Sequence, residues 1–413
     1  MALRCLWLTR LLPYPPSFGG DFIYSSHLIE SIARAGVEVT VLCTDNGGRP
    51  PAVAGVGWRV APASGRRAAF SLGSPLPAIA YRSSTKALEG RLRDTLSDQV
   101  WDAVVFDNVA TGWALDLITQ AVGSQRPAFV YVSHNHEESV RRQLASKYKG
   151  SPVQRWGLSF DALKARLLER RLVDAADLVT VNTREDESLF RERAPEKSFL
   201  VVTPGYDGAV NPKRRFTTDL PRRAVLVGSF GWIGKQQNLL AFLRAAAPRF
   251  RAAGAEIEVL GSMPSSFARE LRDKFPRVRS TQPAGGLAPY LRRARIGVVP
   301  EEIGGGFRHK VLEFVFNRVP VAAVSGCVAG TPLLPGESIL EYADLPSLAE
   351  GVLQVMDDFD LLARMESAAF DACSDRFDWS DRGEILAHAL AELADYPLKN
   401  RSRSGRQAAI RNL

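Results

Sequence analysis

The stretch VPEEIGGGFRHKVLEFVF, residues 299–316, decides the expected fold of this chain. It follows an apolar run that predicts a buried strand, and its second half places Val311, Phe314 and Val315 on one face of a helix. Between them lies the tract Gly304–Gly306, where a ligand can approach the backbone closely because glycine has no Cβ. The N–H groups and the positive dipole end at a helix start favour phosphate. The stretch therefore predicts a strand, a loop and a helix that together bind an anion.

Charged residues next to the tract strengthen this interpretation. Gly304, Gly305 and Gly306 lead through Phe307 into Arg308 and Lys310, two cations in the expected first helical turn. Cations there oppose the helix dipole, and a bound anion would remove that cost. Glu313 lies three residues after Lys310, where its carboxylate can accept hydrogen bonds from ribose hydroxyls. A glycine triplet without such neighbours would be more typical of a flexible surface loop.

The rest of the chain alternates short apolar runs with helix-length segments, in two blocks. Several runs are apolar on both faces, as buried parallel strands are. Such alternation predicts an α/β fold of two Rossmann-like domains with parallel sheets and a ligand cleft between them. Proline, glycine and charge cluster between residues 205 and 220, where we expect the linker. The expected strands are Leu3–Leu8, Val37–Cys43, Ala103–Phe106, Phe129–Ser133, Leu178–Asn182, Phe199–Thr203, Ala224–Val227, Glu256–Leu260, Arg295–Val299 and Val319–Val324; the expected helices include Asp21–Ala35 and Leu158–Ala176, and the chain from Leu345 to Tyr396 is expected to be helical.

Two other strand ends carry glycine-bearing loops before helices. The first strand runs into a loop with Gly19 and Gly20, whose spacing is not the G-x-G-x-x-G of dinucleotide-binding proteins and excludes an NAD site there. The first strand of the second block is followed by Ser229 and then by Lys235, which can meet a phosphate as a point charge. Alone, a Gly-Gly pair is typical of a turn, and a single lysine is typical of a solvated surface.

A histidine-bearing loop follows the strand Phe129–Ser133. One interpretation is acid–base or electrostatic work by His134 in a central cleft. A second is a metal pair through His134 and His136, for which the remaining histidines supply no further ligand set. The third is an ordinary helix start, with Glu137 and Glu138 as favourable acids in its first turn.

Together these segments resemble glycosyltransferase family 4, retaining enzymes with the GT-B fold. The resemblance covers residues 3–379 and rests on several loose motifs that occur in the expected order. They are Pro13–Pro16 with Gly19-Gly20, then His134-Asn135 with Glu137, then Pro204–Asp207, and finally the glycine tract with Lys310–Glu313 and Pro320-Val321.

The resemblance implies a role for each site residue. Glu313 would hold the nucleotide ribose, Lys235 the donor diphosphate, and the amides from Gly305 to Phe307 the phosphates or the sugar. Gly19 and Gly20 would approach the diphosphate or the acceptor, and His134 would contact the reacting sugar. The remaining expected donor-site residues are Ser229, Gly304, Arg308 and Lys310.

Two departures from the family pattern concern the donor site. Many members carry two glutamates eight residues apart, and Gly305 stands where the first would be. Many also have an arginine where this chain has Ser229. Donor recognition would then fall to backbone amides, with Arg308 replacing the lost positive charge.

Composition limits the other classes of function. The chain has 413 residues and a formal net charge of +8, of which the acid-free tail Lys399–Leu413 supplies five. That tail is either a solvated segment or a contact for anionic lipid. Nucleic acid is not expected, because no aromatic–basic module accompanies the charge. The sequence lacks an apolar run of about 18 residues, and the first residues do not resemble a secretion signal. Four scattered cysteines are expected to be reduced thiols, so a cytoplasmic protein is predicted, with a peripheral place at the inner face of a bacterial cell membrane as the further option.

We therefore expect a glycosyltransferase that moves a sugar from a nucleotide-diphosphate sugar to a glycan, glycolipid or polysaccharide precursor, with retention and without a metal ion or other cofactor. Loops Gly65–Tyr81 and Arg141–Leu158 are expected to shape the acceptor pocket. The alternative is a non-catalytic protein of the same fold that binds sugar nucleotides or glycans. The expected domains are an N-terminal acceptor domain (1–205), a C-terminal donor domain (206–375), helices that pack back on the first domain (376–398) and a basic disordered tail (399–413).

Overall fold

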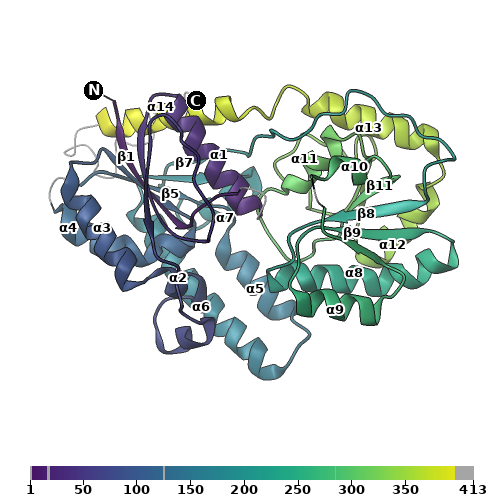
Figure 1. Ribbon diagram of the computed structural model, residues 1–413, viewed down its shortest axis with the longest axis horizontal. Helices are drawn as coiled ribbons and strands as arrows, with labels where there is room; N and C mark the ends of the chain where they lie inside the picture. The colour runs from purple at the N-terminus through teal and green to yellow at the C-terminus, as the bar shows by residue number, and fades with distance from the viewer. Residues whose placement is uncertain (1, 16–18, 124–125, 284, 396–413) are drawn as a thin grey trace. The chain divides into compact units, whose positions relative to one another are not determined.

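The computed structural model describes residues 2–15, 19–123, 126–283 and 285–395 (Figure 1), which divide into two compact units. The first unit holds the described residues up to Gly205, residues 305–307, and those from Asp378 onward. The second unit holds Tyr206–Gly304 and Arg308–Phe377. The glycine tract is thus divided between the two units.

The first unit is built on a seven-stranded parallel sheet. Its central strands β4 and β5 are buried along their whole length, because helices cover both faces of the sheet. The strands are β1 (Arg4–Leu11), β2 (Glu38–Thr44), β3 (Val56–Ala61), β4 (Ala103–Asp107), β5 (Ala128–Val132), β6 (Leu178–Val181) and β7 (Phe199–Val201), paired in the order β3-β2-β1-β4-β5-β6-β7. The helices are α1 (Gly20–Arg34), η2 (Ala68–Gly73), α2 (Ala78–Ser83), α3 (Lys86–Asp98), η3 (Val109–Ala114), α4 (Leu115–Val122), α5 (Glu137–Lys147), α6 (Pro152–Ala175), α7 (Arg184–Arg191) and α14 (Trp379–Asp395).

The second unit has a six-stranded parallel sheet with the same winding. Its strands are β8 (Arg223–Val227), β9 (Glu256–Leu260), β10 (Arg279–Thr281), β11 (Ile296–Val299), β12 (Val321–Val324) and β13 (Leu340–Tyr342), paired in the order β10-β9-β8-β11-β12-β13. The helices are α8 (Ile233–Ala252), α9 (Ser265–Lys274), α10 (Ala288–Leu291), α11 (His309–Phe316), α12 (Leu345–Val355) and α13 (Phe359–Cys373). The strand order reverses between β1 and β4 in one sheet and between β8 and β11 in the other. Ligands of such sheets bind outside the carboxyl ends of the strands at this reversal.

The prediction of two Rossmann-like domains with parallel sheets is confirmed, and the differences lie at the edges. The strands β3, β10 and β13 were not predicted, because β3 alternates exposed and half-buried residues, β10 is largely exposed and β13 is only half buried. Helix α6 begins at Pro152 rather than Leu158, since the Ser151 hydroxyl caps it by accepting from the N–H of Gln154. The chain after Leu345 forms three separate helices, and Tyr396 lies outside the described residues.

Helix α14 comes from the far end of the described chain and completes the core of the first unit. Its Trp379, Leu386 and Leu390 are buried in the same apolar cluster as Leu28 and Ile32 of α1. The two helices lie side by side along the sheet (Figure 1). A Cβ at Gly383 of α14 would lie 2.5 Å from backbone and side-chain atoms of Ser31 in α1. Glycine at this position is therefore required by the close approach of the two helices.

Two general properties complete the description. No helix among the described residues is long and apolar enough to cross a membrane. The four cysteines are all buried and carry free thiols.

Gly383→Ala should destabilise the first unit by about 1–3 kcal/mol, because the added methyl group forces α14 away from α1. Gly90→Ala in α3 is the matched control, since a Cβ there meets no atom within 4 Å. It should stabilise the protein by up to about 1 kcal/mol, because alanine favours the helix more than glycine does. Thermal and urea denaturation measure both changes, and an equal gain from the two variants would disprove the tight packing.

Candidate functional site

In the second unit, the expected donor-site residues gather where the strand order reverses. The loop with the glycine tract follows β11, and Ser229 and Lys235 follow the neighbouring strand β8. Lys235 lies in the first turn of α8, and the Ser229 hydroxyl is 3.3 Å from that of Ser262. Both strands are parallel, so these residues lie at one edge of the sheet.

The centre of this cluster is Glu301, a carboxylate that is 9% exposed. Arg308 approaches it with Nε 2.6 Å away, and Lys310 forms a second ion pair with it. Burial opposes ionisation of Glu301, but the charges of Lys310, Arg308 and Lys235 outweigh it and lower the pKa to about 2. Three cations therefore converge on one buried, ionised carboxylate at the edge where a ligand would bind.

The backbone of the tract takes conformations that favour glycine. The φ angles are 147° at Gly304 and 67° at Gly306, in the region that side chains with a Cβ rarely adopt. A Cβ at Gly304 would also lie 2.8 Å from a guanidinium nitrogen of Arg308. The side chain of Asn238 in α8 binds the loop just before the tract: it accepts from the N–H of Ile303 at 3.0 Å and donates to the Ile303 carbonyl at 2.7 Å. This pair of bonds fixes the loop to the helix that carries Lys235.

The helix behind the tract starts one residue later than the sequence suggested. Arg308 is the N-cap of α11 rather than part of its first turn, and Lys310 is its second residue. A guanidinium has no acceptor, so Arg308 does not cap the helix with its side chain. Of the tract, Gly305, Gly306 and the buried Phe307 group with the first unit.

Glu313 is held on the helix face by a tyrosine. The hydroxyl of Tyr206 donates to the Glu313 carboxylate at 3.3 Å, and the Tyr206 ring stacks on Phe316 with centroids 4.4 Å apart. Burial raises the pKa of Glu313, and the bond from Tyr206 partly opposes that shift. Tyr206 thus positions the carboxylate that the resemblance assigns to the ribose.

In the first unit, His134 is paired with a buried aspartate. Its Nε2 lies 2.6 Å from Oδ1 of Asp107, at the end of β4, and Oδ2 of Asp107 accepts from the Trp7 indole at 2.9 Å. The ring of Tyr24 contacts the His134 ring edge-on, with centroids 5.2 Å apart. His134 is 8% exposed and Asp107 is 1% exposed. The imidazole is therefore fixed in orientation by both charge and packing.

This pairing sets the protonation of His134. Burial alone would lower the pKa of the ring, but the charge of Asp107 and its hydrogen bond raise it above the ordinary 6.5. Because the pKa is raised in the folded protein, the pair stabilises the fold fully below about pH 6.5. That stabilisation is lost as the pH rises through the higher pKa of the folded state.

The loop that carries His134 is anchored to α6. The carboxylate of Glu169 accepts from the N–H groups of Glu137 and Glu138 at 3.1 and 3.0 Å, and from the Tyr131 hydroxyl at 3.1 Å. Burial and the charge of Glu137 raise the pKa of Glu169 to about 8. The start of α5 carries the two expected acids, and Glu169 binds its first N–H groups.

The other expected residues of this unit occupy ordinary positions. Gly19 is the N-cap of α1 and Gly20 its first residue. The backbone at Gly19 is extended, so its φ angle does not require glycine. His136 turns its Nδ1 toward the Ser139 hydroxyl at 2.7 Å. Within the described ranges, no group of three or more His, Cys, Asp or Glu residues is placed to hold a metal ion.

The sequence interpretation did not assign roles to four residues that build these sites: Asp107, Glu301, Tyr206 and Asn238. Two signals were available. Asp107 directly follows the predicted strand Ala103–Phe106, and Glu301 lies two residues after the predicted strand Arg295–Val299. Tyr206 bonds to Glu313, 107 residues away, and Asn238 bonds to Ile303, 65 residues away. No local sequence pattern reveals contacts over such separations.

Two family models match the chain and together cover most of it. The glycosyl transferase 4-like domain matches residues 23–206, and the glycosyl transferases group 1 domain matches residues 221–358. The chain belongs to the group 1 glycosyltransferases. The resemblance noted in the sequence is therefore confirmed at the level of the family. None of the curated proteins compared with the chain matches it significantly.

Solved glycosyltransferase structures confirm the GT-B fold. Sucrose-phosphate synthase from Thermosynechococcus elongatus is 17% identical with a TM-score of 0.70, over 95% of this chain and 99% of that one. Anabaena HepE in complex with UDP-glucose is 14% identical with a TM-score of 0.63, over 94% and 100%. WaaG, a glycosyltransferase involved in lipopolysaccharide biosynthesis, is 13% identical with a TM-score of 0.64, over 94% and 99%.

Asp107→Asn should lower the pKa of His134, because burial then acts on the ring without the opposing charge. Proton–carbon NMR of the histidine rings as a function of pH measures this, with the exposed His388 as internal reference. Asp116→Asn, which removes an exposed carboxylate from α4, is the control and should leave the His134 titration unchanged. An unchanged titration in Asp107→Asn would show that the pair does not set the charge of the ring.

Proposed function

We propose that this glycosyltransferase transfers a sugar from a nucleotide-diphosphate sugar to a glycan, glycolipid or polysaccharide-precursor acceptor, with retention of configuration and without a metal ion. The observation that carries the proposal is the convergence of Lys235, Arg308 and Lys310 on one edge of the second sheet. Fixed cations at that place stabilise the negative charge that grows on a departing diphosphate. The complex of HepE with UDP-glucose supports this class of donor.

The donor would be held along this edge by contacts of three kinds. Lys235 and Arg308 meet the diphosphate, and the amides after Gly304 approach it without a side chain in the way. Glu313, positioned by Tyr206, accepts from the ribose hydroxyls. Glu301 keeps the cations in place before the donor arrives, because each is paired with or attracted to its carboxylate.

His134 would act on the sugar. Its Nε2 is paired with Asp107, so Nδ1 would be the atom that contacts a sugar hydroxyl. A protonated ring donates that hydrogen bond and also offsets negative charge near the reaction centre. We propose departure of the diphosphate from the face on which the acceptor hydroxyl attacks, with the fixed donors rather than a covalent intermediate stabilising the transition state.

The acceptor would bind the first unit, through loops within residues 65–81 and 141–158. The tail 399–413, proposed to contact anionic membrane at the cytoplasmic face, lies outside the described residues. A non-catalytic protein that binds sugar nucleotides is the second candidate, favoured by Gly305 at the position where many members carry a glutamate. Radiolabelled donors separate the two: hydrolysis or transfer supports the enzyme, and tight binding without turnover supports the binder.

Retention is tested on the first donor and acceptor that turn over. Proton NMR of the new anomeric centre, recorded in the presence of EDTA, should show the configuration of the donor and an unchanged rate. An inverted product would exclude the proposed mechanism, and loss of turnover in EDTA that returns with magnesium would exclude metal independence.

Lys235→Ala and Glu313→Ala should each reduce transfer at least about tenfold, because each removes a charged contact to the donor. Lys274→Ala in α9 is the matched control, since Lys274 is exposed and pairs with Glu270 one turn earlier in the same helix. Circular dichroism checks that the variants fold. Near-normal turnover in either site variant would withdraw that residue from the donor site.

A further inference from the structure

Helix α6 carries a stripe of apolar side chains on its outer side. Val153, Trp156, Phe160, Leu163 and Leu167 are spaced by three or four residues, which places them on one face of the helix. Val153 is 78% exposed, Trp156 63%, Leu163 42% and Leu167 50%. The rings of Trp156 and Phe160 stack with centroids 5.7 Å apart. The stripe is about 21 Å long, at 1.5 Å per residue.

The short helix η2 extends this stripe. Lys164 of α6 is buried and donates to the carbonyl oxygens of Ser71 at 2.7 Å and Ser74 at 3.3 Å, which ties η2 to α6. Phe70 and Leu72 of η2 are 66% and 51% exposed. In Figure 1 the turn before α2 and the N-terminal half of α6 project from the same side of the first unit. We call η2 and the α6 stripe the apolar surface.

The apolar surface accounts for most of the large apolar side chains that the described residues expose. Six of the eleven, namely Phe70, Leu72, Val153, Trp156, Leu163 and Leu167, belong to it. Single exposed apolar residues are ordinary, whereas a contiguous group marks a surface that binds something.

The charge around the apolar surface is predominantly positive. Residues 62–88 and 145–160, which include η2 and the first part of the stripe, contain seven cations and no acid: Arg66, Arg67, Arg82, Lys86, Lys147, Lys149 and Arg155. The one acid between the ends of the stripe is Asp161, whose carboxylate pairs with Arg141. This surface therefore suits a partner that is both apolar and anionic.

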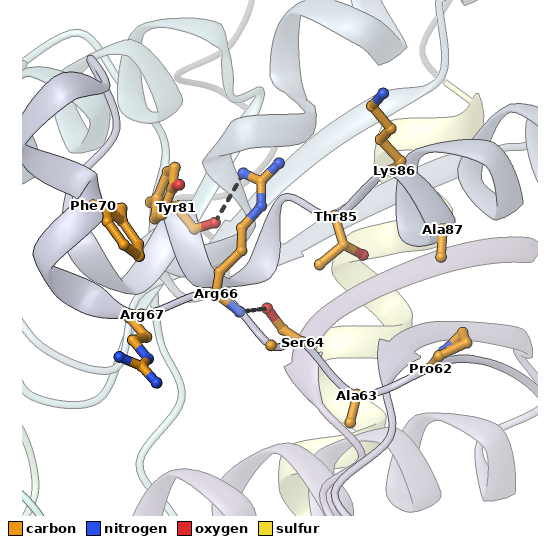
Figure 2. A pocket seen from close by; sticks show the side chains of 11 residues that line it. Pro62, Ala63, Ser64, Arg66, Arg67, Phe70, Tyr81, Thr85, Lys86 and Ala87 are labelled. Carbon is orange, nitrogen blue, oxygen red and sulfur yellow. Dashed lines mark hydrogen bonds between the residues drawn. The ribbon is translucent and has the colours of Figure 1, made fainter.

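An open cavity of about 530 Å³ is lined by both cationic and aromatic side chains. Its lining includes the cations Arg66, Arg67 and Lys86 together with Phe70 and Tyr81. Figure 2 shows the Arg66 side chain turned toward Tyr81, whose carbonyl it meets at 3.4 Å. The Arg66 guanidinium also lies 4.8 Å from the centre of the Tyr81 ring. The cavity thus places a held cation beside the exposed ring of Phe70.

We propose that the apolar surface docks on a lipid bilayer with anionic headgroups. Tryptophan and phenylalanine side chains favour the boundary between headgroups and acyl chains, and flanking arginines and lysines bind the phosphates. The stripe lies flat on the bilayer, and the cavity takes a headgroup phosphate at Arg66 and Arg67. This inference concerns binding alone and does not depend on the proposed reaction.

Co-sedimentation of the full-length chain with vesicles tests the apolar part. Vesicles of phosphatidylcholine are compared with vesicles that also contain phosphatidylglycerol. Trp156→Ser and Val153→Ser should each weaken binding to the mixed vesicles several-fold, and the double variant at least tenfold. Val100→Ser, which removes an equivalent exposed side chain elsewhere in the first unit, should bind like the wild type.

Trp156→Phe separates a docking role from a merely structural one. It keeps an aromatic side chain, so it should retain vesicle binding. It should also lose the part of the lipid-dependent blue shift in tryptophan fluorescence that Trp156 supplies in the wild type. A blue shift equal to that of the wild type would show that Trp156 stays in water and would contradict the proposal.

Charge reversal tests the headgroup contact. Arg67→Glu should reduce binding to phosphatidylglycerol-containing vesicles several-fold, and added salt should reduce the difference from the wild type. Arg93→Glu on the exposed side of α3 is the matched control and should have a smaller effect. Equal effects of the two variants would mean that net charge, rather than this surface, determines binding.

Two outcomes would overturn the proposal. If all the apolar variants bind vesicles like the wild type while deletion of 399–413 abolishes binding, the tail alone contacts the lipid. If the chain is a dimer that Trp156→Ser dissociates, as analytical ultracentrifugation without lipid would detect, the apolar surface joins two copies instead. Binding of a nucleoside diphosphate should stay unchanged in every variant, so failure here is distinguishable from failure of the proposed function.

Discussion

A buried carboxylate at the strand-order reversal is the constraint on which both sites depend. In the first sheet it is Asp107, the last residue of β4, and in the second it is Glu301, just after β11. These two strands hold equivalent places in the two sheets. A buried negative charge is costly unless it is paired and hydrogen-bonded, so each carboxylate requires cationic or N–H partners at that edge. Asp107 obtains His134 and Trp7, and Glu301 obtains Arg308 and Lys310.

The two units surround this carboxylate with different groups. The first holds one imidazole in a fixed orientation and favours its protonated form. The second gathers several cations around a loop whose backbone bends through glycine. The acid at the tract is Glu301, four residues before Gly305, where many members of the family have a glutamate. Its carboxylate binds the neighbouring cations, so it organises positive charge as well as contributing a negative one.

Features that depend on neighbouring residues could be predicted from the sequence, whereas contacts between residues far apart in the sequence could not. The central strands were predicted because they are buried on both faces and therefore consist of continuous apolar runs. The edge strands β3, β10 and β13 were missed because they are partly exposed and leave no such run, whereas the edge strand β7 was predicted because Phe199 and Leu200 are buried. The glycine tract and the cations Arg308 and Lys310 lie within seven consecutive residues, so the sequence alone shows that they are neighbours. The pairing of His134 with Asp107 spans 27 residues and exists only because β4 and β5 are neighbours, which the strand pattern alone does not determine. The bond between Tyr206 and Glu313 spans 107 residues and joins a segment between strands to a helix.

The position of α14 also has a consequence for synthesis on the ribosome. The strands of the first unit emerge early, but the helix that covers α1 follows the entire second unit. Roughly 170 residues must be translated in between, which takes roughly 10–35 s at the usual rate of elongation. During that time the nascent chain presents Leu28 and Ile32 without Trp379, Leu386 and Leu390. The apolar core of the first unit can therefore be completed only after the whole second unit has been translated.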